Sequence, residues 1–120
     1  MKNNYLSLTS KYHAERLKQL GFDWPCNYFF KDGIDVALPQ HPEMKPLEGH
    51  ISVPTVELAF KWLREVKGIH SYVCTYLAQS GPRHHGVYFT EDWNECHSAI
   101  CEDYEDAEMH LLSELLGILK

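Results

Sequence analysis

The chain has 120 residues, 44% of them hydrophobic and 23% charged, and its formal net charge is −6 at neutral pH. This length corresponds to one domain, and this composition excludes an intrinsically disordered chain. No apolar run approaches the roughly 20 residues of a membrane span, and the first residues lack the apolar core of a secretory signal. We therefore expect a single cytoplasmic domain over residues 1–120, without membrane contact, whose four cysteines stay reduced.

The first predicted element is a helix over residues 9–20. This segment opens on a Thr-Ser pair of good N-caps, repeats apolar residues at helical spacing and is followed by Gly21. A β-hairpin is expected next, with strands over residues 26–31 and 34–38. Asp32-Gly33 between them favours a two-residue type I′ turn.

The middle of the chain predicts a loop and then a second helix. Residues 39–49 contain three prolines among mixed polar residues, which is typical of a loop. Residues 55–66 follow Pro54 and end shortly before Gly68, so both helix boundaries are signalled. Their apolar residues cover a wide arc, and we expect this helix to be well buried.

A second hairpin is expected in the following segment. Residues 69–79 alternate as a strand does, and residues 85–90 form the returning strand after the break at Ser80-Gly81-Pro82. Residues 91–101 leave three structures open: a loop, a short edge strand at residues 98–101, or a helical turn.

The last predicted element is a helix over residues 104–116, with Asp103 as its cap and acidic residues in the first turn, where the helix dipole favours negative charge. The element order is α-ββα-ββα. We therefore predict an α+β fold in which three helices pack on one face of a four-stranded, mainly antiparallel sheet. The side chains expected in its core are Leu17, Phe60, Leu63, Leu111 and Leu115.

Four stretches of the sequence carry a resemblance. They are residues 20–26 (LGFDWPC), the helix start Pro54-Thr55, residues 61–70 (KWLREVKGIH) and residues 104–107 (YEDA). Together they resemble uncharacterised small proteins of prophages and mobile elements in Bacteroides-type bacteria, over most of the chain apart from residues 39–49 and 91–101. The resemblance implies a bacterial, phage-derived cytoplasmic protein. That family has no known activity, so the resemblance assigns no catalytic, cofactor or binding residue.

Charge is distributed unevenly along the chain. Residues 1–83 hold ten Lys/Arg and eight Asp/Glu, whereas residues 84–119 hold nine Asp/Glu and no Lys or Arg. A nucleic-acid-binding domain normally carries a basic stripe, so direct nucleic-acid binding is not expected. The acidic third, with aromatic residues expected to be exposed, favours a protein-interaction module. The candidate partner-binding residues are Tyr88, Trp93, Glu102, Asp103 and Asp106.

Two further interpretations of the acidic third remain open. Its carboxylates could form a solvated surface that keeps the chain soluble. They could also stand in for phosphates and occupy a basic groove of the partner. Composition alone separates neither of these from ordinary docking.

The alternative to an interaction module is a small enzyme or metal-binding protein that uses Cys96, His97 and Cys101. Zinc takes about four N/S ligands, and the two cysteines lie at the outer limit of the usual pair spacing. His84-His85 is a poor second pair, because adjacent residues of a strand face opposite sides. A cysteine nucleophile needs a base that faces it in a cleft, which a sequence neighbour seldom provides. We therefore expect no metal and no cofactor and name no catalytic residue; the sequence sets neither the partner nor the oligomeric state.

Overall fold

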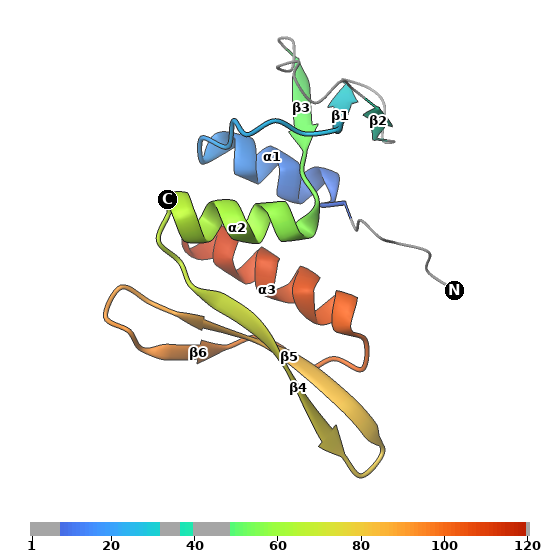
Figure 1. The fold of residues 1–120 in the computed structure, drawn as a ribbon, viewed down its shortest axis with the longest axis vertical. Helices are drawn as coiled ribbons and strands as arrows, with labels where there is room; N and C mark the ends of the chain where they lie inside the picture. Colours follow the sequence, from blue (N-terminus) through green and yellow to red (C-terminus); the bar gives the residue numbers. More distant parts are fainter. Residues whose placement is uncertain (1–7, 32–36, 40–48, 120) are drawn as a thin grey trace. The chain divides into compact units, whose positions relative to one another are not determined.

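Figure 1 shows the computed structural model, which describes residues 8–31, 37–39 and 49–119. Within these ranges the fold is α+β, as predicted, with three helices and two three-stranded antiparallel sheets. The chain divides into two compact units, residues 1–59 and 60–120. One domain over residues 1–120 stays a prediction. None of the helices in the described ranges is long and apolar enough to cross a membrane.

The first unit packs helix α1 (Lys11–Gln19) on a small sheet. Ser10 caps the helix, because its hydroxyl accepts a hydrogen bond of 3.2 Å from a backbone N–H of the first turn. The strand order is β2-β1-β3, with β1 at Tyr28–Lys31, β2 at Leu38–Pro39 and β3 at His50–Val53 (Figure 1). Helix and strands share a buried cluster of Ala14, Phe30 and Val53.

Strand β3 corrects the sequence prediction, which had no strand between the loop and the second helix. It pairs along the whole of β1, with Ser52 opposite Phe29. The first hairpin is confirmed as the β1–β2 pair, but a two-residue turn would place Tyr28 opposite Ala37, whereas Tyr28 lies opposite Pro39. The turn at residues 32–33, most of the predicted second strand and residues 40–48 of the predicted loop lie outside the described residues.

Helix α2 (Val56–Val66) is confirmed, and the Thr55 hydroxyl accepts a hydrogen bond of 3.1 Å from the Leu58 N–H at its start. Four of the five predicted core residues are fully buried, but Phe60 is only half-buried. The reason is rotational: Phe60 lies about 100° around the helix from Ala59, outside the buried stripe. That stripe consists of Val56, Ala59, Trp62 and Leu63.

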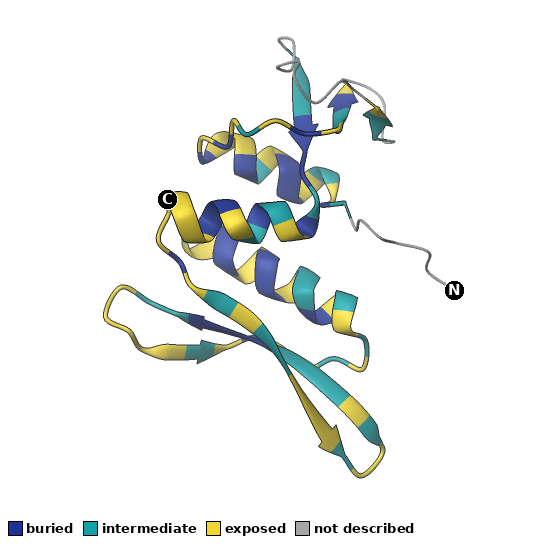
Figure 2. Ribbon diagram, viewed as in Figure 1, coloured by how far each residue is buried: buried dark blue, intermediate teal, exposed yellow. Residues whose placement is uncertain are grey.

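The second unit is a sheet of order β4-β5-β6 with helix α3 (Tyr104–Ile118) on one face (Figure 1). Its strands are β4 at Ser71–Ala78, β5 at Gly81–Phe89 and β6 at Glu95–His97. One side of α3 is buried along its length (Figure 2), through Ala107, Leu111, Leu112, Leu115 and Leu116. The final helix is therefore confirmed.

The second hairpin is confirmed with a tighter turn than expected. Ala78 pairs with Gly81, so the returning strand begins at Gly81 rather than at residue 85, and only two residues form the loop. The φ of +124° at Gly81 is a conformation that side-chain-bearing residues rarely adopt. Within residues 91–101, a short edge strand lies at 95–97; the strand suggested at 98–101 is wrong, although Cys101 forms an isolated bridge with His84.

The predicted single four-stranded sheet with three helices on one face is wrong for the described residues. Each hairpin has a third strand of its own: β3 completes the first sheet and β6 the second. The helices are also divided, since α1 packs on β3 and α3 packs on β5. Two local three-stranded sheets thus replace the one shared sheet that the α-ββα-ββα order suggested.

Helix α3 approaches β5 closely at Gly86. A β-carbon at this position would lie 2.6 Å from the Ser98 hydroxyl oxygen and 2.7 Å from Cβ of Leu111. The Gly86 N–H donates to the buried Ser98 hydroxyl at 2.9 Å, and the Ser98 N–H donates to the Gly86 carbonyl at 2.9 Å. Only glycine leaves room for both the helix and this hydrogen-bonded serine.

Candidate interaction surface

The two faces of the β4–β5–β6 sheet differ, because side chains alternate along each strand. On one face, Gly86 and Tyr88 are directed at α3, where they meet Leu111 and Glu114. The rings of the opposite face pack on one another, with His85 5.1 Å from His97 between ring centroids. The side chains of that opposite face include Tyr72, Cys74, Tyr76, His85, Val87, Phe89, Glu95 and His97.

Tyr88 is not an exposed docking residue, which corrects the sequence prediction. It is buried on the α3 side of β5, with a relative exposure of 8%. Burial, followed by the hydrogen bond and negative charge of Glu114 and by the nearby Cys96, raises the pKa of its hydroxyl to about 12. Tyr88 therefore fastens α3 to the sheet as a neutral phenol.

Trp93 is exposed, as predicted, and occupies the turn between β5 and β6. Its side chain is 68% exposed, yet it lies beside His70 and Phe89, at centroid distances of 5.7 and 6.1 Å. Its backbone φ is +60°, the only positive value among non-glycine residues in the described part of the chain. A bulky residue rarely adopts this conformation, which costs about 1–3 kcal/mol.

Backbone hydrogen bonds hold this strained turn closed. The Trp93 N–H donates to the Thr90 carbonyl at 2.8 Å, and the Thr90 N–H donates to the Asn94 carbonyl at 3.1 Å. The Thr90 hydroxyl accepts a further bond from the Asn94 N–H at 3.3 Å. The indole is thus presented to solvent on a constrained backbone.

Three acidic residues lie close to Trp93 in the sequence. Glu91, Asp92 and Glu95 are all exposed and lie within two residues of Trp93. The Glu95 side chain contacts that of His97, whose Nε2 lies 2.9 Å from a Glu95 carboxylate oxygen. We name residues 90–95 the acidic turn. Sequence reasoning identified Trp93 but missed these three acids as its companions.

The other predicted acidic residues gather at the start of α3. Asp103 is the N-cap, and its carboxylate accepts a hydrogen bond of 2.9 Å from the Glu105 N–H. Glu102 lies 3.4 Å from Arg83, although its side chain is 82% exposed, and such pairs contribute little to stability. Asp106 is exposed in the first helical turn. Asp103 thus has a structural role, whereas Glu102 and Asp106 are exposed.

The predicted partner-binding residues therefore do not form one patch. The start of α3 lies beside His84, whose ring is 5.5 Å from that of Tyr104, while Trp93 lies beside Phe89. His84 and Phe89 are five residue steps apart along β5, a span of about 17 Å at the usual rise of a strand. In Figure 1 the β5–β6 turn lies at the left of this sheet and the first turn of α3 lies to the right.

The alternative site residues are also divided. Cys96 is directed at the α3 side near Tyr88, while the adjacent His97 lies on the opposite face. Cys101 pairs its backbone with His84, and burial followed by the carboxylates of Asp106 and Asp103 raises the pKa of its thiol. A nucleophilic cysteine needs the opposite shift. Among the described residues, no three His, Cys, Asp or Glu side chains are placed to hold a metal ion.

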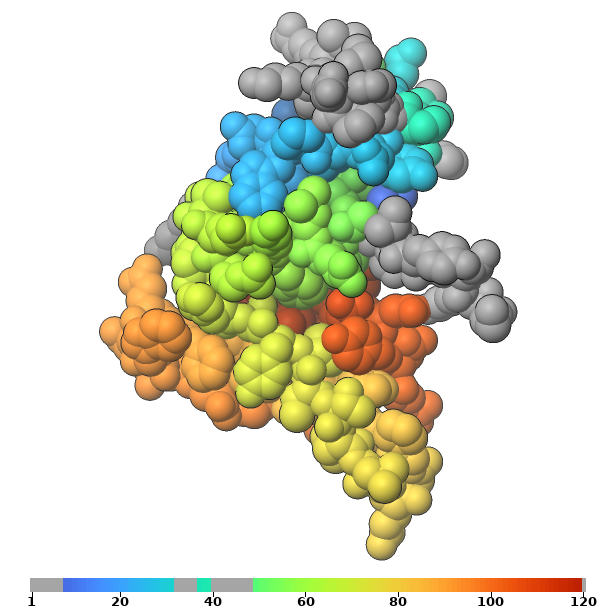
Figure 3. All heavy atoms as spheres, viewed as in Figure 1, coloured from blue at the N-terminus to red at the C-terminus, as the bar shows by residue number. Residues whose placement is uncertain are grey.

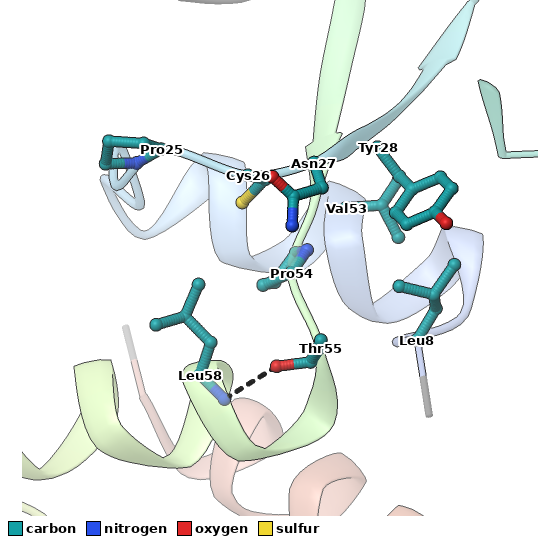
Figure 4. A pocket seen from close by; sticks show the side chains of 9 residues that line it. All are labelled: Leu8, Pro25, Cys26, Asn27, Tyr28, Val53, Pro54, Thr55 and Leu58. Atoms are coloured by element: carbon teal, nitrogen blue, oxygen red, sulfur yellow. Dashed lines mark hydrogen bonds between the residues drawn. The ribbon is translucent and has the colours of Figure 1, made fainter. Parts of the chain in front are cut away.

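A small pocket in the first unit was not foreseen from the sequence (Figure 4). It encloses about 70 Å³, much less than the roughly 300–1,000 Å³ typical of ligand sites. Burial raises the pKa of Cys26, which lines it, to about 11, so this thiol stays protonated. The other lining residues are Leu8, Pro25, Asn27, Tyr28, Val53, Pro54, Thr55 and Leu58.

The geometry supplies an exposed turn that combines an indole with three carboxylates. Comparison of the chain with protein-family models, with curated proteins and with solved structures found no match.

Proposed function

We propose that this chain is a small cytoplasmic, phage-derived protein-interaction module that docks a basic protein partner through its acidic turn. The observation that carries the proposal is Trp93: a large aromatic side chain that is exposed and held on strained backbone among carboxylates. Strain of this kind persists where surrounding structure enforces it, and it concentrates at functional positions.

The chemistry of the turn suits docking. Tryptophan, with tyrosine and arginine, is enriched among the energetic anchors of protein interfaces, and charged residues at the rim direct the approach of the partner. Glu91, Asp92 and Glu95 supply that rim, and residues 84–119 contain no Lys or Arg to neutralise it. A partner with a basic surface and an apolar recess for the indole fits these features.

Origin and location are supported by two further observations. The resemblance to prophage and mobile-element proteins favours a phage-derived origin. Cys74, Cys96 and Cys101 are free thiols, as suits a reducing compartment. Glu102 and Asp106 at the start of α3 add negative charge for long-range attraction, while Asp103 serves the helix.

The test is a pull-down from bacterial host cells, with captured proteins quantified by mass spectrometry. Trp93→Gly is the informative variant, because glycine accepts the positive φ and relieves strain while it removes the indole. We expect its folding stability to stay within about 1 kcal/mol of wild type, and capture of the basic partner to be lost.

A charge variant and its matched control complete the experiment. The double variant Glu91→Lys with Asp92→Lys should lose the partner. The double variant Glu102→Lys with Asp106→Lys makes the same charge change at the start of α3 and should still capture most of the partner. Higher salt should weaken capture by wild type, since the Debye length shortens from about 10 Å at 0.1 M to about 3 Å at 1 M. Equal capture by wild type and Trp93→Gly would refute the proposed function.

A further inference from the structure

Strand β4 is an edge of its sheet, and one row of its backbone groups faces outward. The Phe89 N–H donates to the His70 carbonyl at 3.1 Å, so the pair 70–89 is a hydrogen-bonded pair of the antiparallel ladder. Such pairs alternate along the strands. The N–H and C=O groups that point away from β5 are therefore those of Ser71, Val73, Thr75 and Leu77.

In the described residues, the other edge strands have features that limit pairing with a further strand, and β4 has none of these features. Strand β6 has three residues and includes Glu95, β2 has two residues and includes Pro39, and the His50 carbonyl of β3 accepts a hydrogen bond of 3.2 Å from Lys18. Short length, charge and proline are the usual protections of an edge. Strand β4 is eight residues long, SYVCTYLA, without charge, proline or glycine.

Several apolar side chains of β4 are also exposed to solvent. Tyr72 is 52% exposed, Tyr76 is 39% exposed and Leu77 is 82% exposed. Figure 2 shows intermediate and exposed positions along the strand, and its atoms are visible at the surface in Figure 3. An uncovered, apolar edge of this length is a template for another strand.

We infer that β4 pairs with β4 of a second copy of this chain, antiparallel and centred on Cys74, to join two sheets across a two-fold axis. In this register Val73 lies opposite Thr75 of the second copy, and Ser71 lies opposite Leu77 of the second copy. The four residues whose backbone groups point outward then all form hydrogen-bonded pairs with the second copy. Hydrogen-bonded and non-hydrogen-bonded pairs alternate in an antiparallel ladder, and this register satisfies that alternation.

The side chains fit this register as well as the backbone does. Tyr72 lies opposite Tyr76 of the second copy, and aromatic cross-strand pairs stabilise antiparallel sheets. Because β4 carries no charge, self-pairing brings no like charges together, whereas a charged strand would find no counter-charge on β4. The uncharged edge thus selects a copy of itself over a charged partner strand.

The helices and the opposite edge permit a closed dimer. Helix α3 lies mainly over β5, and three strand spacings separate β5 from its copy, about 14 Å. Packed helices need only about 8–10 Å, so the two α3 helices do not collide. Because the remaining edge is the short β6, the pairing is isologous and stops at two chains.

Sedimentation velocity of the full chain tests the inference. Wild type should sediment as a dimer, and Cys74→Lys should weaken dimerisation by about tenfold or more, because two like charges then lie directly opposite each other. Ile100→Lys is the matched control, since it adds the same charge at an exposed apolar site outside β4, and it should stay dimeric. The acidic turn is unchanged in these variants, so the outcome is separable from that of the proposed function.

Oxidative cross-linking tests the register. Directly opposed cysteines in a non-hydrogen-bonded pair lie close enough for a disulfide, so mild oxidation should link two wild-type chains through Cys74. Cys74→Ser should abolish the link, and Cys101→Ser should retain it. A wild-type chain that remains monomeric at every concentration would overturn the inference, and so would a dimer that cross-links equally well after Cys74→Ser. In the monomeric case, the expected partner of the β4 edge would be an extended strand of another protein.

Discussion

Replacement of Gly86 by alanine should destabilise the second unit through a steric conflict between β5 and α3. The new methyl group would lie 2.6 Å from the Ser98 hydroxyl, 2.7 Å from Leu111 Cβ and 2.8 Å from Leu111 Cδ1. A movement of the Leu111 side chain alone relieves only one of these contacts, because Cβ is fixed to the helix backbone. Helix α3 must therefore shift away from β5, and the Ser98 hydroxyl must move as well.

The expected loss in free energy of unfolding is about 2 kcal/mol. Overpacking by one methyl group costs about 1–3 kcal/mol, and displacement of Ser98 weakens buried hydrogen bonds worth about 1 kcal/mol each. Alanine gains about 0.5–1 kcal/mol over glycine in a strand, which offsets part of this cost. Urea denaturation at equilibrium, followed by tryptophan fluorescence, measures the difference.

Gly117→Ala is the matched control for this substitution. Gly117 lies in α3, and a β-carbon added there would meet no neighbouring atom within 4 Å. The same change should therefore stabilise the protein there by up to about 1 kcal/mol, through helix propensity alone. A Gly86→Ala protein as stable as wild type would refute the close packing of α3 on β5.

Four further predictions concern stability and titration. Trp62→Ala should cost about 3–5 kcal/mol in urea denaturation, and Phe60→Ala clearly less, because Phe60 is only half-buried. Asp103→Ala should lower the free energy of unfolding by about 0.5–2 kcal/mol through loss of the N-cap, while Asp103→Asn keeps most of it, as thermal melting would show. Because the folded pKa of Tyr88 is raised from 10.0 to about 12, its contribution to stability should be complete below pH 10 and lost as pH rises to 12; Tyr88→Phe should flatten this part of the pH profile of unfolding. The Cys26 thiol, with its pKa raised from 9.0 to about 11, should resist iodoacetamide at pH 8 in the folded protein and react in urea, as mass spectrometry of the labelled chain would record.

The helices were predictable because their signals are local. Ser10 and Asp103 cap α1 and α3 as the sequence indicated, and the apolar repeats of all three segments placed them within about two residues. The second hairpin was predictable for the same reason, since alternation and a turn signal lie side by side. The first hairpin had an equally strong turn signal, yet Tyr28 pairs two residues further along than that turn would place it.

What the sequence could not supply was pairing between distant segments. Strand β3 alternates polar and apolar residues but is only four residues long, and its partners in β1 lie 19 to 25 residues away along the chain, so the pairing with β1 decides that it is a strand. The single four-stranded sheet failed for the same reason, because nothing local decides which edge of a hairpin finds a third strand. The position of Phe60 depended on which arc of a broadly apolar helix faces the interior.

The candidate site divides in the same way. The exposure of Trp93 was predictable from its polar, acidic surroundings in the sequence. Tyr88 could not be placed, because the face of β5 on which it lies is decided by where α3 packs. The separation of the acidic turn from Glu102 and Asp106 likewise follows from the length of β5, a property of the folded sheet.

Site-specific photo-cross-linking in bacterial host cells tests the docking role of the acidic turn most directly. A photoreactive phenylalanine derivative would be introduced in place of Asp92 in one variant and in place of Tyr104, at the start of α3, in another. Both positions are exposed and both belong to the second unit. Position 92 detects a partner at the acidic turn, whereas position 104 detects a partner at the acidic residues that begin α3. The account predicts a discrete cross-linked basic protein from position 92 and little or none from position 104. Cross-links confined to position 104, or absent from position 92, would contradict it.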